Sequence, residues 1–549
     1  MDLPPFETHQ VDNQPPAFAP RDLWLDDTAL REAVAREGAS GFAGRVAAYG
    51  ALAGSELYAL SFDAHRDRPR LRMHDANGRR IDRVEYHPNY HAVMAAAIEH
   101  GIAGLSWTEP GPGAHVARAA LSYLHYQAEP GSSCPLTMTH AAVPVLQREP
   151  GLREWAAKAA APHYDRRELP IAAKAGVTLG MGMTEKQGGS DVRANTTVAT
   201  PLPAGDDDPG EPYALVGHKW FMSAPMSDGF LVLAQAPGGL TCFLMPRCLP
   251  GGRLQAGVKN AFALQRLKDK LGDWSNASSE VEFRGARAWR VGGEGRGVAT
   301  ILEMVMLTRL DCMLGSAGLM RMALAQAIHH CRHRRAFGKS LLEQPLMRNV
   351  LADLAIEAEA ALVLSMRVAR AVDAAPRDPA EAAYARVATA IGKFWICKRA
   401  PAFVNEAQEC LGGNGYVEES LLPRLYRQAP LNSIWEGSGN IQCLDVLRAL
   451  AREPGTGAAL WRELQVEGME AAALERLRAP LHGEATIPEA GARAFVESLA
   501  LALQGSALLR AGSPLADTFR RTRLSTPHAS AFGALPTDTP CEDIIARAL

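Results

Sequence analysis

The chain has 549 residues, of which 47% are hydrophobic and 21% are charged, and its formal net charge is -2. A chain of this length exceeds what one hydrophobic core accommodates, so we expect about two to four domains. The composition is typical of a globular protein and excludes extensive disorder. The small net charge excludes a global electrostatic field that attracts nucleic acid or anionic membrane, so such binding would need a local patch.

The cysteines and the N-terminus bear on the cellular compartment. Nine cysteines are scattered along the chain, without a CxxC pair or a Cys/His cluster of zinc-site spacing, so we expect reduced, buried thiols and no metal site. The N-terminal segment is polar and proline-rich and does not resemble a secretory signal. No apolar run is long enough to span a bilayer. These features predict a soluble, cytoplasmic protein without membrane contact.

Hydrophobic periodicity divides the chain into segments of different texture. After a proline-rich arm of about twenty residues, the segment from Leu23 to Lys174 has apolar residues at helical spacing. Short apolar or alternating runs separated by Gly, Pro and Asp then predict strands from Gly176 to about Gly293, with a solvated loop at 201–212.

Helical periodicity returns after the predicted strands, in runs of two dozen residues or more that could pack as a bundle. The segment 451–457 has the composition of a linker into a last helical region, and the tail after Thr526 has no clear periodicity. We therefore predict a mainly α protein with a central β domain. The expected domains are an N-terminal arm and helical domain (1–176), a β domain (177–293), a C-terminal helical bundle (294–450) and an appended helical domain (451–549).

The first segment with chemical content is glycine-rich and runs from Met181 to Asp191. A flavin needs small residues where backbone N–H groups approach its ring, and hydroxyls for its pyrimidine edge. Gly189 exemplifies the first requirement, and Thr184 and Ser190 meet the second. Taken alone, this segment fits an ordinary glycine-rich β-turn equally well.

Two further segments fit the same cofactor. The segment 217–223 places an aromatic residue and then a hydroxyl on a strand, which suits a flavin ring, although aromatic strand residues are more often core residues. The segment 334–339 clusters arginines after a helix, where forked hydrogen bonds can hold a pyrophosphate. A solvated charge run is the more common outcome of such a cluster.

The fourth segment consists of 411–416 and 434–440. Glu436 stands between Trp435 and Gly437, so its carboxylate can lie desolvated against an apolar wall, which would raise its pKa into the range of a general base. Without the other segments, an exposed surface glutamate would be the better interpretation.

Together, in this order and with these separations, the four segments resemble the acyl-CoA dehydrogenase superfamily over most of the chain, up to about Leu450. The resemblance implies FAD bound between a β-barrel-like domain and a C-terminal four-helix bundle, with a homotetramer completing the site. It implies that Glu436 is the base that removes the proton alpha to a thioester, with Arg309 near the substrate. The residues implied to contact FAD are Met181, Gly182, Met183, Thr184, Gly189, Ser190, Phe221, Met222, Ser223, Arg334, Phe337, Gly412, Gly413, Ser438 and Asn440.

The chain also departs from the common pattern of that superfamily. Lys186 replaces a proline, Glu409 stands where many members have glutamine, and Val305 and Met306 occupy a region where a polar residue is expected to help seat coenzyme A. These departures and the appended domain resemble the AidB-like, alkylation-response branch. That resemblance implies binding of double-stranded DNA through the last domain and a weak residual dehydrogenase activity of the isovaleryl-CoA type.

Charge supports DNA binding only weakly, because residues 451–549 contain ten Arg, no Lys and twelve Asp or Glu. A helical oligomerisation domain explains this composition as well. The alternative functions are a genuine acyl-CoA dehydrogenase for short or branched substrates without DNA binding, and a DNA-coating tetramer with FAD as a structural part. The candidate DNA-binding residues are Arg448, Arg510, Arg520, Arg521 and Arg523.

Overall fold

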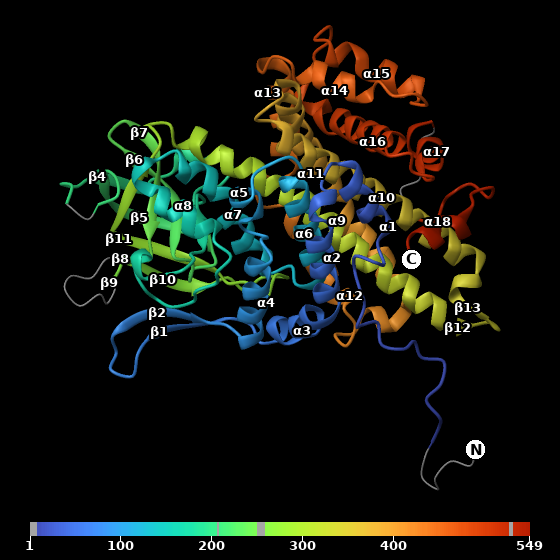
Figure 1. The fold of residues 1–549 in the computed structure, drawn as a ribbon, viewed down its shortest axis with the longest axis horizontal. Helices are drawn as coiled ribbons and strands as arrows, with labels where there is room; N and C mark the ends of the chain where they lie inside the picture. The colour runs from blue at the N-terminus through green and yellow to red at the C-terminus, as the bar shows by residue number, and fades with distance from the viewer. Residues whose placement is uncertain (1–7, 206–207, 250–257, 526–530) are drawn as a thin grey trace.

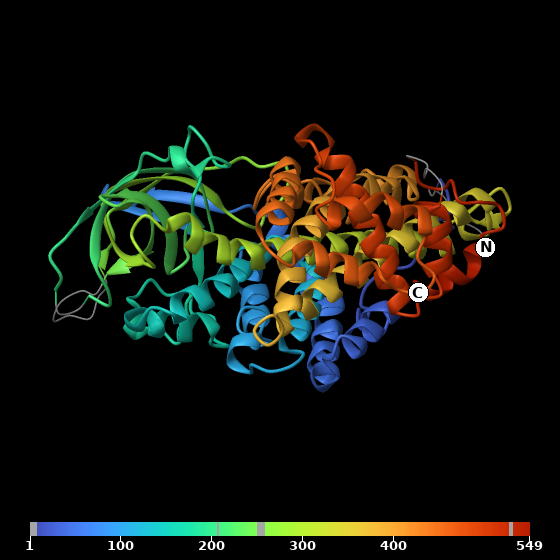
Figure 2. The ribbon, with the colours of Figure 1, turned by 90° about the horizontal axis from the view of Figure 1, so that it is seen from above.

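The structure is a computed structural model that describes residues 8–205, 208–249, 258–525 and 531–549. N-terminal helices and long C-terminal helices pack together, and a β domain projects from one end of them (Figures 1 and 2). A last group of helices covers the bundle on the side where α13, α10 and α11 lie. This arrangement confirms the predicted fold class.

The N-terminal part is mostly helical, as predicted. Asp27 caps its first helix by accepting a hydrogen bond from the backbone N–H of Leu30. Two later helices, α6 and α7, are buried along nearly all of their length and join this part to the bundle. The helices are α1 (Thr28–Arg36), α2 (Ala43–Leu52), α3 (Tyr58–Arg66), α4 (Pro88–Glu99), α5 (Leu105–Thr108), α6 (Ala114–Ala128), α7 (Ser133–Gln147) and α8 (Arg153–Ala160).

A β-hairpin interrupts these helices and was not predicted. Its antiparallel strands are β1 (Arg70–His74) and β2 (Arg80–Glu85). Asp75 builds the turn, because its carboxylate accepts hydrogen bonds from the backbone N–H groups of Asn77 and Arg79. This segment forms a hairpin although the surrounding sequence has helical periodicity, because its short alternating runs are flanked by turn residues.

The central domain is built on a seven-stranded sheet. Its order is β10-β11-β5-β4-β6-β3, and β7 pairs with both β11 and β6, which curls the sheet toward a barrel. Ser223, at the end of β5, lies opposite Ser278 at the start of β11. The strands of this sheet are β3 (Leu179–Gly182), β4 (Val198–Pro201), β5 (Pro212–Ser223), β6 (Gly229–Ala236), β7 (Gly239–Pro246), β10 (Phe262–Leu267) and β11 (Ser278–Val291), and β8 (Cys248–Leu249) and β9 (Val258–Lys259) form a separate two-stranded sheet.

Three long helices form the centre of the C-terminal bundle. They are α9 (Gly297–His333), α10 (Pro345–Ala374) and α11 (Pro379–Glu409), and each packs against the other two. The small hairpin of β12 (Arg335–Ala336) and β13 (Lys339–Ser340) turns the chain between α9 and α10. The shorter helices α12 (Leu422–Gln428) and α13 (Gly439–Arg452) complete the bundle, and α13 lies against α11.

The appended helices belong to the same hydrophobic core as the bundle. The chain leaves the helix at Glu453 and turns at Gly455, whose φ is +87°, within the predicted linker. The helix α16 then packs on α10, α11 and α13. The helices are α14 (Thr456–Leu464), α15 (Ala471–Leu481), α16 (Ala492–Arg510), α17 (Ala516–Phe519) and α18 (Cys541–Arg547).

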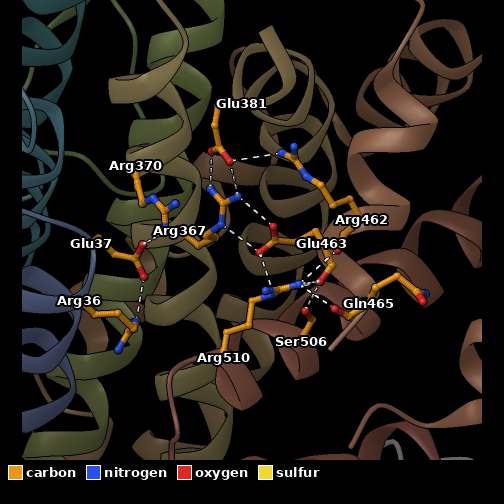
Figure 3. A network of polar contacts seen from close by, with 10 residues as sticks. All are labelled: Arg36, Glu37, Arg367, Arg370, Glu381, Arg462, Glu463, Gln465, Ser506 and Arg510. Carbon is orange, nitrogen blue, oxygen red and sulfur yellow. Dashed lines mark hydrogen bonds and ion pairs between the residues drawn. The ribbon is translucent and has the colours of Figure 1, made fainter. Parts of the chain in front are cut away.

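A buried polar network fastens the appended helices to the bundle (Figure 3). Arg367 of α10 donates two hydrogen bonds to Glu381 of α11 and two to Glu463 of α14, at 2.8–3.0 Å. All three side chains are over nine-tenths buried. Because paired charges at this depth are costly to separate, α14 is held to the bundle as one unit.

None of the helices within the described ranges combines the length and apolar character that a membrane crossing requires.

Candidate functional site

The candidate base lies in a sharp turn just before α13. Glu436 has φ +59° and the following Gly437 has φ +98°, so two consecutive residues adopt left-handed conformations. For a residue with a side chain this conformation carries strain, and it persists only where the surroundings enforce it. A Cβ on Gly437 would come within 2.7 Å of the Gln442 side chain, so glycine is required there for space as well.

Lys393 of α11 stabilises this turn through two hydrogen bonds. The residue is 1% exposed, and its Nζ donates to the backbone carbonyl oxygens of Trp435, at 2.8 Å, and Gly437, at 2.5 Å. These carbonyls belong to the residues on either side of Glu436. The ammonium group therefore fixes both neighbouring peptides of the candidate base.

The carbonyl of Glu436 itself has two donors. Arg309 Nε donates to it at 3.0 Å and Gln442 Nε2 at 3.1 Å. Arg309 also forms an ion pair of 2.8 Å with Asp445, which in turn binds Arg386. Arg309, expected near the substrate, thus lies beside the base, but its guanidinium group is occupied by the protein itself.

The Glu436 carboxylate lies in an environment that favours its neutral form. Burial raises its pKa above the ordinary value, and the effect outweighs a hydrogen bond from Thr308 and the positive charges of Lys393 and Arg309. Thr308 Oγ1 donates to Glu436 Oε2 at 2.8 Å. A carboxylate with a raised pKa and one directed hydrogen bond can accept a proton from a weak carbon acid.

Cys134 connects the base to the strand motif. Burial, followed by the nearby Asp273, raises the pKa of its thiol to about 12, so the thiol is protonated. The Ser223 hydroxyl acts to lower the pKa of this thiol and the Glu436 carboxylate acts to raise it, so both groups belong to its electrostatic surroundings. Ser223 also lies 3.2 Å from the Ser278 hydroxyl. The fold thus brings the second and fourth sequence segments to one place.

A buried ion pair, which the sequence analysis did not predict, stabilises the glycine-rich segment. Glu185 and Lys219 are fully buried side chains with 2.7 Å between Oε1 and Nζ. Burial acts to raise the pKa of Glu185, but hydrogen bonds from Lys219 and Thr197 prevail and lower it to about 2. Glu185 also accepts from the backbone N–H of Thr196 at 2.7 Å. Because Lys219 lies on β5, this ion pair fixes the loop that carries Thr184 and Ser190 to that strand.

The surface near this loop has the features that a flat cofactor ring requires. Phe221 is 50% exposed, which is unusual for an aromatic strand residue. A Cβ on Gly189 would come within 2.8 Å of Thr184 Oγ1, so glycine lets the two segments of the loop approach. The remaining expected ring contacts, Met181, Gly182, Met183, Ser190, Met222 and Ser223, lie on the same strands or loop.

A second group of expected cofactor residues lies elsewhere. Arg334 and Phe337 follow the C-terminal end of α9, whereas the β domain adjoins its start (Figure 1). A helix of 37 residues is about 55 Å long. Within one chain, the two groups therefore cannot contact the same ring.

This second group also has the features of a binding surface. Phe337 is 97% exposed with φ +51°, and Tyr416 is 84% exposed. A Cβ on Gly412 or Gly413 would meet no atom within 4 Å, so open space lies above both glycines. Uncovered rings beside open glycines fit an extended dinucleotide such as FAD.

The last two expected cofactor residues follow the base. Ser438 is the N-cap of α13 and is exposed. Asn440 Oδ1 accepts a hydrogen bond of 3.0 Å from Arg493 of α16. The appended helices thus reach the segment that carries the base.

The candidate DNA-binding arginines are all engaged in the structure. Arg523 is 9% exposed and pairs with Asp353, while Arg510 donates to the backbone carbonyls of Arg462, Glu463 and Gln465 at the end of α14 (Figure 3). The more exposed members also face carboxylates: Arg448 with Asp445, Arg520 with Glu470 and Asp517, and Arg521 with Asp538. Arginine clusters in the sequence therefore do not form a patch of uncompensated charge here.

The sequence contains a signal for the buried Lys393, which the sequence analysis did not use, but it contains no local signal for the buried Glu185. A single lysine inside the apolar run 387–397 is a signal of a buried, partnered cation. Glu185 sits in a polar, glycine-rich loop, where burial of its side chain leaves no trace in the local pattern.

Comparison with known protein families supports the reading of the motifs. The model described as the adaptive response protein AidB N-terminal domain matches residues 13–166. The middle and C-terminal domain models of acyl-CoA dehydrogenases match residues 180–286 and 295–451. Residues 452–549 lie outside these three matches.

Individual relatives agree with the family models. The putative acyl-CoA dehydrogenase AidB of Escherichia coli (strain K12) is 46% identical over 530 residues, which are 95% of each chain. The acyl-CoA dehydrogenase family member 11 of Caenorhabditis elegans is 32% identical over 72% of this chain and 65% of its own.

Solved structures show the same architecture. The Caenorhabditis elegans ACDH-11 complex with C11-CoA has a TM-score of 0.82 at 27% identity, over 94% of this chain and 91% of that chain. Butyryl-CoA dehydrogenase of Megasphaera elsdenii, at 19% identity, has a TM-score of 0.56 over 79% of this chain and all of that chain, a likeness of fold alone. The chain therefore belongs to the acyl-CoA dehydrogenase superfamily, in the AidB branch, and is an FAD-dependent oxidoreductase of the acyl-CoA dehydrogenase type.

Proposed function

We propose that Glu436 is the base of an acyl-CoA dehydrogenation, and that it removes the proton alpha to a thioester carbonyl. One observation carries this proposal: a carboxylate with a raised pKa stands in an enforced left-handed turn and accepts a hydrogen bond from Thr308. Desolvation makes the carboxylate more basic than one in water. Partial exposure of Glu436 leaves its side chain accessible to a substrate.

Each neighbour then has a defined task in that step. Thr308 orients the carboxylate through its hydrogen bond, and Lys393 holds the flanking peptides so that the strained turn persists. FAD supplies the acceptor for the hydride that leaves the beta carbon. Phe221, Ser223 and the glycine-rich loop would hold the ring, with Glu185 keeping that loop in place.

The substrate class that we propose is a short or branched acyl thioester of coenzyme A, turned over weakly. Its support is the family membership, relatives such as the isovaleryl-CoA dehydrogenase of rice, and the apolar, buried Val305 on α9 near Thr308. Loss of a polar residue in this region removes one contact for coenzyme A, which fits a modest rate.

We also propose a homotetramer. The β domain with the ring-contacting group adjoins the start of α9, whereas Arg334 and Phe337 follow its C-terminal end (Figure 1). Gly412 and Gly413 come shortly after Cys410, whose carbonyl oxygen accepts a hydrogen bond from Cys331 near that same end. An FAD molecule that touches both groups needs them from two different chains. An exposed Phe337 at a strained φ is then a residue that a neighbouring chain's cofactor would cover.

A role in the alkylation response, with binding of double-stranded DNA in the cytoplasm, is the second proposal. It rests on the 46% identity to AidB and on the adaptive-response family model. Since the arginines of the appended helices are paired with carboxylates, DNA phosphates would have to compete for them, so we expect weak and strongly salt-dependent binding.

Anaerobic titration of the yellow protein with isovaleryl-CoA tests the dehydrogenase proposal. We expect bleaching of the flavin absorbance, and at least a hundredfold slower bleaching in Glu436→Gln. The matched control is Glu475→Gln, which changes an exposed carboxylate on α15 and should bleach at the parent rate. Equal rates in Glu436→Gln and the parent would remove Glu436 as the base.

A gel-retardation series with duplex DNA at increasing salt tests the second proposal. Replacing Arg520 and Arg521 together by Ala should weaken binding severalfold at low salt, because both are surface cations, whereas Arg153→Ala on α8 should not. Buried Arg523 is left intact so that folding is preserved. Absence of retardation of the parent protein at low salt would end the DNA proposal while leaving the dehydrogenase proposal untouched.

A further inference from the structure

A cavity of about 560 Å³ lies between the N-terminal part and the β domain. Its walls come from β2, α4, the segment 164–168 and the turn 224–228. The volume falls in the range of pockets that bind small organic molecules. The residues expected to contact FAD are absent from its lining.

Aromatic rings and thioethers form much of the lining. Tyr86 and Tyr90 are stacked with ring centroids 4.4 Å apart, and the rings of His91 and Tyr164 are stacked at 5.9 Å. His91 also meets Tyr90 edge-on, so the four rings are continuous. Met94 and Met226 add polarisable sulfur atoms. Surfaces of this composition favour a flat aromatic guest.

One buried polar group in this lining has no partner. The hydroxyl of Ser227 makes no hydrogen bond among the described residues, although Ser227 is only 3% exposed. Buried hydroxyls in native proteins are nearly always hydrogen-bonded, and an unpaired one costs about 1–3 kcal/mol. Because Ser227 Oγ is closed to solvent in this orientation, a ligand in the cavity reaches it after the side chain rotates about its Cα–Cβ bond, and the new hydrogen bond would remove this cost.

Cations outnumber carboxylates around the cavity, because Arg247 is a second partner of Glu168 and Asp228, and Arg166 has no carboxylate partner among the described residues. Every carboxylate of the lining has a cationic partner: Glu85 has Arg72, Asp165 has Arg167, Glu168 has Arg83, and Asp228 has Lys174. Arg166 forms no ion pair with any residue that the structure describes. It lies close enough to His91 to add to the effect of burial, which lowers the pKa of that ring to about 4, so His91 is neutral near pH 7.

The inner wall of the cavity is shared with the site of the reaction. Pro135 and Ala224 line the cavity, and each directly follows a residue near the proposed flavin site, Cys134 and Ser223 respectively. A molecule in the cavity would therefore press on the backbone that carries Ser223. Its binding should be visible in the flavin spectrum.

We propose that this cavity is a second binding site, separate from the acyl thioester site, for a flat aromatic molecule with one negative charge. The ring lies among the tyrosines and methionines, Ser227 Oγ bonds a polar atom of the ligand, and the Arg166 guanidinium receives an anionic group such as a carboxylate or a sulfonate. The site does not depend on the proposed roles of Glu436 or of DNA.

Titration of the FAD-loaded protein with 8-anilinonaphthalene-1-sulfonate, a fluorescent aromatic sulfonate, tests this inference. Saturating crotonyl-CoA is present throughout to occupy the acyl thioester site. We expect saturable binding of one probe per chain and a small shift of the flavin absorbance. Arg166→Ala should weaken binding about five- to tenfold through loss of a charge-assisted contact, and Ser227→Met, which fills the cavity, should abolish it.

Arg153→Ala is the matched control, since this arginine is equally exposed, on α8, and does not line the cavity. It should bind the probe like the parent protein. If the probe does not bind, or if it binds Arg166→Ala and Ser227→Met as tightly as the parent, the inference is wrong. Arg166 is a surface residue, so its variant remains informative even if Ser227→Met fails to fold.

Discussion

At the scale of single residues, the candidate site is a carboxylate whose surroundings act on its backbone as much as on its side chain. The side chains of Lys393, Arg309 and Gln442 donate hydrogen bonds to backbone carbonyl oxygens of the turn that carries Glu436. The sequence predicts Glu436 as the base through the resemblance of four segments to the acyl-CoA dehydrogenase superfamily, whereas its flanking residues alone favour an exposed surface glutamate. Its partners come from three different helices, which no local pattern connects.

The hydrogen bond from Thr308 sets the pH range of the proposed reaction. A base works in its deprotonated form, so the rate of flavin bleaching should rise with pH through the raised pKa of Glu436. Thr308→Val removes the donor that stabilises the carboxylate, and the midpoint of the pH–rate profile should move upward by about one pH unit. Thr308→Ser keeps the hydroxyl and serves as control. An unchanged midpoint in Thr308→Val would mean that this hydrogen bond does not act on the base.

Lys393 should matter through the position of the base. We expect Lys393→Met to lower the bleaching rate about ten- to a hundredfold and to move the pH–rate midpoint upward, because a nearby positive charge favours the carboxylate. FAD content and circular dichroism show whether the variant is folded. Lys393→Arg, which keeps the charge, should leave the midpoint near that of the parent. A midpoint that stays constant in Lys393→Met would restrict Lys393 to a structural role.

At the scale of elements, the glycine-rich loop depends on β5 through the buried pair of Glu185 and Lys219. Its glycines and hydroxyls predict flavin contact from the sequence alone, but the position of the loop depends on a glutamate that reads as a surface residue. The β1–β2 hairpin shows the same limit, since its two short strands lie within a helical context and gain stability only by pairing.

Breaking this pair should loosen the cofactor loop. We expect Lys219→Met to lower the free energy of unfolding by about 3–5 kcal/mol, because the remaining Glu185 charge is buried without its counter-ion, and to weaken FAD retention. The double variant Glu185→Gln/Lys219→Met should recover much of the loss. Urea unfolding and FAD release check both. A single variant as stable as the parent would show that the pair contributes nothing.

The same pair predicts an acid dependence. The pKa of Glu185 in the folded protein is lowered to about 2, below its ordinary value of 4.5. Its contribution to stability is therefore fully present above about pH 4.5 and is lost as the pH falls toward 2. Glu185→Gln lacks this contribution, so its stability should decline less steeply between pH 4.5 and 2 in thermal unfolding experiments. An equally steep decline would assign the acid sensitivity to other carboxylates.

At the scale of the whole molecule, the appended helices are part of the main core and not a tethered module. Arg367 joins α10, α11 and α14 (Figure 3), and Arg493 of α16 reaches Asn440 beside the base. The sequence predicts a separate domain at this boundary because the segment 451–457 has the composition of a linker. The packing of the helices after this linker on those before it cannot be predicted from the local sequence.

Arg367→Leu tests this unity. The change leaves Glu381 and Glu463 buried without their shared cation, so we expect a loss of about 3–5 kcal/mol in the free energy of unfolding. Because one core spans both parts, unfolding followed by calorimetry should remain a single transition. Arg476→Ala, an exposed position on α15, is the control and should change little. Separate transitions for the two parts would show that the appended helices fold independently.

The sequence by itself determined the fold class, the family, the cofactor and the candidate base. Periodicity and motif chemistry are local properties of each segment, and the family follows from four such segments in their order and separation along the chain. Only the tertiary structure decided what surrounds Glu436, that the clustered arginines of the appended helices face carboxylates, and that the expected FAD contacts form two distant groups. Most of these contacts join residues tens to hundreds of positions apart, although Arg448 and Arg520 also pair with carboxylates three positions away. Burial and charge pairing select them when the chain folds.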